Sequence, residues 1–324
     1  MSSLGQTFRE LRKSKGLTLK EVADDQISVA VISKFENGAS MLGLDRFLHL
    51  LNQINATTSE FFYWQTDRYA VKPSVVFGHS GHGAPGIKLL EPFYEIIELV
   101  NQAESKTARA KAVEQYQQRI QKATHEHPTQ MNRQILAYAN SSVDLLHYNL
   151  DQASHDILPV VHYLESVDQW GEFELFLLIF SLTFVDTDDL TRLFKRAMRR
   201  ADWYQWLAEE RYLRYNLCFD AFSVLVGKQH YDEARLVLEQ MDTLVHSKSD
   251  SDMQFAVQAL FMHGWLDIVT GAKEKGKQQC ENALSVYRIL NVSGDEDLLR
   301  PIYDHILKYD PSDKKHMMIM LTLD

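Results

Sequence analysis

Basic side chains gather near the start of the chain, where Arg9, Lys13, Lys15 and Lys20 all fall within the first twenty residues. Cations so placed can neutralise nucleic-acid phosphates, and an affinity built on them falls steeply with salt. The alternative for each is an ordinary solvated helix face. Residues 1–65 carry seven basic and seven acidic side chains, so the segment is neutral and phosphate contact must come from a local basic edge.

Catalytic and metal chemistry have little support in the residue pattern. His79 with His82, or His125 with His127, could form ligand pairs, but no HExxH motif or cysteine set accompanies them. A metal site needs three or four ligands with supporting neighbours. Neither a nucleophile elbow nor a glycine-rich phosphate loop occurs. We predict no enzyme activity, no cofactor and no metal.

The composition is that of an ordinary globular protein of two or three packed units. The 324 residues are 45% hydrophobic and 24% charged, with a formal net charge of −10. Since residues 1–65 are neutral, the acidic balance lies in the remainder and argues against nucleic acid as its partner. The longest apolar stretch, residues 173–185, is too short to cross a bilayer and fits a buried helix.

Two cysteines, Cys218 and Cys280, are too few for a disulfide framework. With no signal-like N-terminus, they predict a cytoplasmic protein. A redox sensor is the alternative to two buried, inert thiols.

Two short helices around a tight turn must position the first basic residues. Thr18 and Glu21 have capping-box spacing and start a helix over residues 19–24. Ser28 is a suitable N-cap for a helix over residues 29–37, which Asn37-Gly38 would end.

Apolar spacing predicts helices on both sides of this pair. Upstream, Phe8 and Leu11, with help from Leu4, mark a helix that ends before Gly16. A downstream stripe comprises Leu44, Phe47, Leu48, Leu51 and Ile54. Thr58 or Ser59 then caps a closing turn through Phe61 and Phe62.

Residues 4–63 resemble the lambda-repressor-like (Xre) helix-turn-helix domain. They match its pattern G-[LM]-[ST]-x-x-[ED]-[LV]-A followed by [IV]-S-x-[FWLI]-E-[RN]-G. The resemblance implies that the second helix of the pair enters the major groove of DNA while the first helix and its neighbours grip phosphates.

Site residues follow from this resemblance. The base-facing positions would be Val29, Ala30, Val31, Ser33 and Lys34. The phosphate contacts would be Arg9, Lys13, Lys15, Lys20 and Asn37. Arg12 and Glu36 resemble a buried structural pair that bridges the first and third helices.

The recognition positions depart from the family's usual polar residues. Val29-Ala30-Val31 can contact thymine methyl groups but cannot make bidentate hydrogen bonds, and Leu19 stands where the family usually has Gln. Specificity would then depend on Ser33, Lys34 and DNA shape. The alternative is that the three apolar residues belong to the core.

Pro, Gly and Ser interrupt the helical pattern between residues 71 and 86, so we place a linker at 66–88 between a DNA-binding domain (1–65) and a C-terminal domain (89–324). The C-terminal domain is predicted to be all-α. Its expected helices cover 89–124, 128–149, 150–167, 172–185, 188–201, 203–226, 231–248, 252–270, 274–292 and 296–309.

These helices pair into hairpins. Residues 231–238 look like the second helix of a tetratricopeptide unit, and residues 264–270 with 283–287 look like another. The fold class is therefore all-α, a lambda-repressor-like domain followed by a tetratricopeptide-like right-handed helical-repeat domain. The concave face of such a stack can accept an extended peptide.

The whole architecture resembles the Rgg/GadR/MutR regulators of Gram-positive bacteria. LGQTFRELRKSKGLTL, ISKFENG and LDRFLHLLNQINATTSEFF match their N-terminal pattern. The resemblance implies a homodimer that reads an inverted-repeat promoter and is regulated by a short imported pheromone peptide, as in quorum sensing. Some members cross-link their DNA-binding domains through a cysteine, and residues 1–65 contain none.

Peptide recognition requires side chains that bond backbone amides and termini. The densest set of such side chains is Arg211, Tyr212, Arg214, Tyr215 and Asn216. A mixed outer helix face is the alternative interpretation.

We therefore predict a peptide-controlled transcriptional regulator that binds DNA sequence-specifically. The alternative is a helical-repeat interaction scaffold whose helix-turn-helix module no longer reads DNA specifically.

Overall fold

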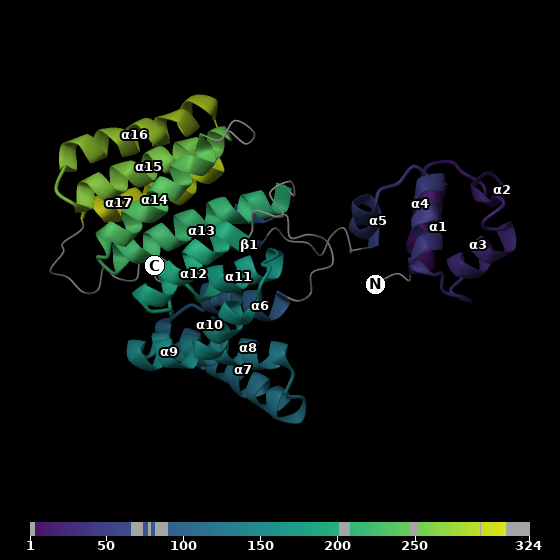
Figure 1. The fold of residues 1–324 in the computed structure, drawn as a ribbon, viewed down its shortest axis with the longest axis horizontal. Helices are drawn as coiled ribbons and strands as arrows, with labels where there is room; N and C mark the ends of the chain where they lie inside the picture. Colours follow the sequence, from purple (N-terminus) through teal and green to yellow (C-terminus); the bar gives the residue numbers. More distant parts are fainter. Residues whose placement is uncertain are drawn as a thin grey trace. The chain divides into compact units, whose positions relative to one another are not determined.

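The computed structural model describes residues 4–65, 74–76, 79–81, 90–200, 208–246, 252–291 and 293–308. The chain divides into two compact units, Met1–Lys88 and Leu89–Asp324, and each is described by itself (Figure 1). None of the described helices is long and apolar enough to cross a membrane.

The N-terminal unit is a bundle of short helices. They are α1 (Leu4–Ser14), α2 (Leu19–Val22), α3 (Val29–Glu36), α4 (Leu44–Gln53) and α5 (Thr58–Gln65). Their shared core comprises Phe8, Leu11, Val22, Ile27, Ile32, Phe35, Leu50, Leu51, Ile54, Ala56 and Phe61. Rings of Phe8, Phe35, Phe47 and Phe61 contact one another in series through this core.

Helix boundaries follow the predicted caps, with three differences. One is that Thr57, and not Thr58 or Ser59, caps α5, since its Oγ1 accepts from the Glu60 amide at 3.0 Å. The capping box is confirmed, because the Glu21 amide donates to Thr18 Oγ1 (3.3 Å) and the Thr18 amide donates to Glu21 Oε2 (2.7 Å). Helix α2 ends at Val22, earlier than expected. Ser28 occupies the N-cap position of α3, but its hydroxyl makes no capping bond. Gly38, with φ of +72°, follows the end of α3 as expected.

The predicted apolar stripe of α4 was wrong at two positions. Leu44 and Leu48 are 69% and 37% exposed, whereas Leu50 is fully buried. The buried face of α4 is formed by Leu50 and Leu51 with partly buried Phe47, and Ile54 continues it just after the helix.

A short antiparallel hairpin occurs within the predicted linker. Strand β1 (Ser74–Val76) pairs with β2 (His79–Gly81), with Val75 opposite Ser80. Strands of three residues are too short for an alternation of apolar and polar positions to predict them.

The C-terminal unit is a stack of helices. They are α6 (Glu91–Gln102), α7 (Lys106–Glu126), α8 (Gln130–Leu146), α9 (Leu150–Asp156), α10 (Leu158–Ser166), α11 (Glu172–Ser181), α12 (Thr187–Arg200), α13 (Ala208–Gly227), α14 (Tyr231–Val245), α15 (Met253–Val269), α16 (Lys273–Leu290) and α17 (Ser293–Leu307). Two expected helices are each divided, 89–124 into α6 and α7 and 150–167 into α9 and α10. Ser105 caps α7 and Pro159 lies in the first turn of α10.

Helical hairpins organise this unit. Helix α13 packs on α14 and α15 packs on α16, while α11, α13, α15 and α17 also contact one another in that order (Figure 1). Helices α11, α13, α15 and α17 therefore form one layer, against which α14 and α16 pack. The predicted helical-repeat architecture is confirmed.

Close backbone contact fixes the α15–α16 hairpin. A Cβ atom added to Gly264 would lie 2.7 Å from the carbonyl oxygen of Gly276 and 2.6 Å from Cys280 Sγ. Cys218 and Cys280 are fully buried free thiols, and burial raises the pKa of each to about 12. Neither is placed to act as a thiolate redox sensor.

Candidate nucleic-acid interface and ligand-binding face

The outward face of α3 carries most of the predicted base-contacting residues. Val29, Ala30 and Lys34 are exposed, and Ser33 is half-buried. Positions 29, 30, 33 and 34 share one side of a helix with a period of 3.6 residues, opposite Ile32 and Phe35 in the core. This face offers two small apolar side chains, one hydroxyl and one ammonium group.

Val31 lies differently. It is half-buried and packs against the core of the N-terminal unit, so the core interpretation fits this residue while Val29 and Ala30 remain exposed. We leave Val31 out of the base-contacting set.

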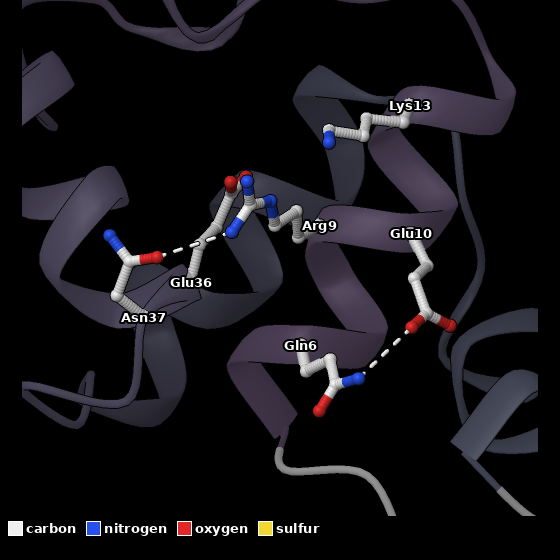
Figure 2. Close-up of a pocket in the computed structure, with 6 residues that line it drawn as sticks. All are labelled: Gln6, Arg9, Glu10, Lys13, Glu36 and Asn37. Carbon is white, nitrogen blue, oxygen red and sulfur yellow. Dashed lines mark hydrogen bonds between the residues drawn. The ribbon is translucent and has the colours of Figure 1, made fainter.

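A hollow of about 380 Å³ lies beside this face, between α1 and the end of α3 (Figure 2). Arg9 Nη1 donates to Asn37 Oδ1 across it at 3.2 Å, and Lys13 also lines it. The remaining lining residues are Gln6, Glu10 and Glu36. Three predicted phosphate ligands, Arg9, Lys13 and Asn37, thus share one surface.

The other two predicted phosphate ligands lie elsewhere. Lys15 is bonded within the unit, since its Nζ lies 3.0 Å from Glu60 Oε1 and donates to the carbonyl oxygen of Asn55 at 3.2 Å. Lys20 is exposed on α2 and lies outside the hollow. The structure therefore groups Arg9, Lys13 and Asn37 and separates Lys15 from them.

A buried ion pair joins α1 to the end of α3. Arg12 Nε donates to Glu36 Oε1 at 2.6 Å and Nη2 donates to Oε2 at 2.9 Å, with the two side chains 6% and 4% exposed. Arg12 Nη1 also donates to the carbonyl of Leu17, ahead of α2. The predicted structural pair is present, and it ties all three helices together.

Asp24 is a positioning residue that no sequence motif indicates. Its Oδ1 accepts from the amides of Gln26 and Ile27, and its Oδ2 accepts from His49 Nε2 at 2.6 Å and Gln53 Nε2 at 3.0 Å. Partial burial raises the pKa of Asp24, but these hydrogen bonds and the nearby His49 outweigh it and hold the pKa below its usual value. The ionised carboxylate thereby anchors the turn between α2 and α3 to α4.

In the C-terminal unit, two of the predicted peptide-binding residues are packed inside. Tyr215 is fully buried, stacks on Phe255 with ring centroids 3.9 Å apart, and donates to the carbonyl of Leu244. Arg214 is 8% exposed and donates to the carbonyl of Met198. Both side chains hold α13 against neighbouring helices.

Three candidates remain on α13. Tyr212 and Asn216 are half-buried, and the Tyr212 hydroxyl donates to Gln254 Oε1 at 3.3 Å. The side chain of Arg211 lies outside the described residues. Among the residues that are described, no group of His, Cys, Asp and Glu could hold a metal ion, and His82 lies outside them.

Comparison with known families matches both units. A helix-turn-helix family matches residues 8–61, and the family "HTH-type transcriptional regulator Rgg, C-terminal domain" matches residues 110–298, more than half of the chain. The chain belongs to the Rgg family of transcriptional regulators. It is thus a DNA-binding regulator of a class that is not enzymatic, and the match gives no support to a scaffold that has lost DNA reading.

Solved structures share the fold of this Rgg-family regulator along nearly its whole length. A putative transcriptional regulator from Listeria monocytogenes EGD-e is 21% identical, with a TM-score of 0.70 and coverage of 94% of this chain and 97% of the other. The Streptococcus dysgalactiae SHP pheromone receptor Rgg2 is 19% identical, with a TM-score of 0.65 and coverage of 94% and 99%. The PrgX/iCF10 complex is 12% identical, with a TM-score of 0.64 and coverage of 99% and 95%.

The close approach of α1 and α3 in this Rgg-family regulator gives a test of the interface geometry. A Cβ atom at Gly5 would overlap the carbonyl oxygen of Phe35 and lie 3.1 Å from the Glu36 Cα. Because backbone cannot yield as a side chain does, Gly5→Ala should destabilise the N-terminal unit by about 1–3 kcal/mol. Amide hydrogen exchange of residues 4–65 would measure the loss.

Gly43→Ala is the matched control, since an added Cβ there meets no atom within 4 Å. Equal exchange in the two variants would show that α1 and α3 do not pack as closely as described.

Proposed function

We propose that this Rgg-family regulator binds an inverted-repeat promoter site as a homodimer in the cytoplasm, and that a short signalling peptide bound to its helical-repeat unit controls it. One observation carries the DNA part. The exposed side of α3 adjoins the hollow where Arg9, Lys13 and Asn37 meet, so base-contacting and phosphate-contacting groups share one surface. The base-contacting set is Val29, Ala30, Ser33 and Lys34.

The two chemistries divide along this surface. Val29 and Ala30 suit thymine methyl groups, and Lys34 and Ser33 can donate to acceptors on base edges. Arg9 and Lys13 neutralise phosphates, while the Arg9–Asn37 hydrogen bond fixes the guanidinium before DNA arrives. Sequence specificity with so few polar groups would depend partly on DNA deformability.

The peptide part is supported by the two-layer hairpin stack and by relatives of the same fold. One is described as an SHP pheromone receptor and another as a PrgX/iCF10 complex. A peptide would act by binding one conformation of the dimer more tightly than another. Such stacks offer their inner layer to an extended ligand.

Fluorescence anisotropy on the intergenic DNA that flanks the protein's own gene tests the DNA part. We expect sequence-selective binding whose logarithmic affinity falls linearly with the logarithm of salt concentration. Each lost phosphate contact should flatten the slope by about 0.9, so the Arg9→Gln and Lys13→Gln variants should bind more weakly on all sequences.

Lys111→Gln makes the same change of charge on the exposed side of α7 and should leave the slope unaltered. Binding no better than to random competitor DNA would overturn the proposal and favour the scaffold. Light scattering tests the homodimer, whose mass should be twice the 37.5 kDa chain mass.

A further inference from the structure

Helices α13 and α15 lie side by side in the same direction. The Tyr212 hydroxyl bonds Gln254, the Tyr215 ring stacks on Phe255, and the rings of Phe222 and Trp265 meet edge to face at 5.5 Å. These pairs advance together along both helices. Between these pairs, the same alignment of the two helices places Asn216 of α13 level with Gln258 of α15.

Part of the surface of α13 faces α12 and α14. Arg214 reaches the carbonyl of Met198 on α12, and Tyr215 reaches the carbonyl of Leu244 on α14. At 100° per residue, Asn216 and Asp220 lie together on the side away from Arg214. Half-buried Asn216 and Val224 flank Asp220 there. This side of α13 is turned away from α12, and we take it as the inner face of the repeat stack.

Three oxygen atoms along this inner face have no hydrogen-bond donor among the described residues. They are Asn216 Oδ1, Asp220 Oδ1 and Gln258 Oε1, and the side chains of Asp220 and Gln258 are 3% and 1% exposed. An amide can present either an oxygen or a nitrogen, but a carboxylate only accepts. Asp220 therefore shows that this face lacks a hydrogen-bond donor.

A buried acceptor without a donor is costly, and a buried carboxylate without a cation is costlier. Charged residues are almost never fully buried unless they are paired. Within the described part of the chain Asp220 Oδ1 has no such partner, and burial raises the pKa of Asp220 to about 8. Without a ligand the carboxyl group therefore keeps its proton near neutral pH, and a ligand that brings a positively charged donor would favour the ionised form by pairing with it.

We infer that the ligand of this inner face carries a cationic hydrogen-bond donor that pairs with Asp220, while Asn216 and Gln258 bond its main-chain amides. This inference rests on the proposed peptide-controlled function and adds the charge of the ligand to it. The donor is either a peptide amino terminus or a Lys or Arg side chain, since all three supply N–H groups with positive charge.

The test uses the full-length protein and a synthetic library of random octapeptides. Bound peptides are separated with the protein by gel filtration and sequenced by mass spectrometry. A parallel N-acetylated library distinguishes the two sources, because acetylation abolishes binding through the terminus and leaves binding through Lys or Arg intact. We expect one of these two signatures in the wild type.

Asp220→Asn should lower the affinity of the enriched peptides by at least about 30-fold, which corresponds to the lower end of the cost of breaking a buried charge pair. Asp220→Ser is a second neutral variant, and melting curves of both should show folded protein. Asp304→Asn, at an exposed position on α17, should bind as the wild type does.

Peptides enriched without a cationic bias, or held equally well by Asp220→Asn, would overturn the inference and leave peptide control standing. No enrichment of any peptide would overturn both peptide control and the inference.

Discussion

Arg12→Met is expected to lower the free energy of unfolding of the N-terminal unit by about 3–5 kcal/mol, because it leaves the Glu36 carboxylate buried without its partner. The methionine keeps much of the arginine stem, so most of this loss would come from the charge and its hydrogen bonds. The carbonyl of Leu17 loses a donor at the same time. Amide hydrogen exchange of residues 4–65 in the full chain would report it.

The double variant Arg12→Met/Glu36→Leu should recover much of that loss. Replacing both members of a buried pair by apolar groups removes the desolvation cost along with the attraction. Lys15→Met is the surface control, since the exposed Lys15–Glu60 pair should contribute about 0–1 kcal/mol. Equal losses for Arg12→Met and Lys15→Met would contradict the assigned role of the buried pair.

Across the Arg12→Met single and double variants, the affinity for DNA should fall and recover together with the stability of the N-terminal unit. Arg12 is not among the residues that line the hollow with Arg9 and Lys13, and its bonds fix α1 against α3. The double variant should therefore recover affinity together with stability. An affinity that stays low in a stable double variant would mean that Arg12, or Glu36 at the edge of the hollow, acts on the DNA itself.

Local motifs were the part of the fold that the sequence revealed. The Thr18–Glu21 capping box and the Arg12–Glu36 pair could be predicted because short-range spacing or a family pattern specifies them. Ser105 carries the same kind of signal, since its hydroxyl accepts from the Ala108 amide and starts α7, although the apolar pattern alone predicts one continuous helix there.

Long-range packing could not be predicted in the same way. The contacts of Asp24 with His49 and Gln53 join residues 25 and 29 positions apart, and no periodicity announces them. The exposure of Leu44 depends on how α4 rotates against α5, which a hydrophobic stripe alone does not determine. Tyr215 and Arg214 looked like ligand contacts by residue type, but neighbouring helices bury them.

Asp220 was visible in the sequence as a lone acidic residue within the apolar run LCFDAFSVL, although its meaning needed the structure. The fold buries the carboxyl group and leaves its Oδ1 without a donor among the described residues. A buried polar group without a partner in a natural protein either destabilises the fold or belongs to a binding site. Measurements of stability against pH distinguish these two possibilities.

Asp220→Asn should make the C-terminal unit more stable at alkaline pH and flatten its pH dependence. Burial raises the pKa of Asp220 from 3.8 to about 8, so between these values the folded chain holds a proton that the unfolded chain has released. Stability of the wild type must then fall as pH rises, by at most about 1.4 kcal/mol per pH unit, and level off above pH 8. The asparagine has no such proton, so the difference in stability between the two proteins should change by about 5 kcal/mol across this pH range.

Urea unfolding followed by tryptophan fluorescence at several pH values would measure this difference, because Trp170 and Trp265 are both buried in the C-terminal unit. Other titrating groups are common to both proteins and cancel in the comparison. A cationic ligand should depress the pKa of Asp220 and flatten the slope of the wild type alone, since only the ionised carboxylate gains from the pairing. Parallel pH profiles for wild type and Asp220→Asn would mean that Asp220 is solvated or paired in the folded protein. There would then be no unpaired buried acceptor, and no reason to infer a cationic ligand from it.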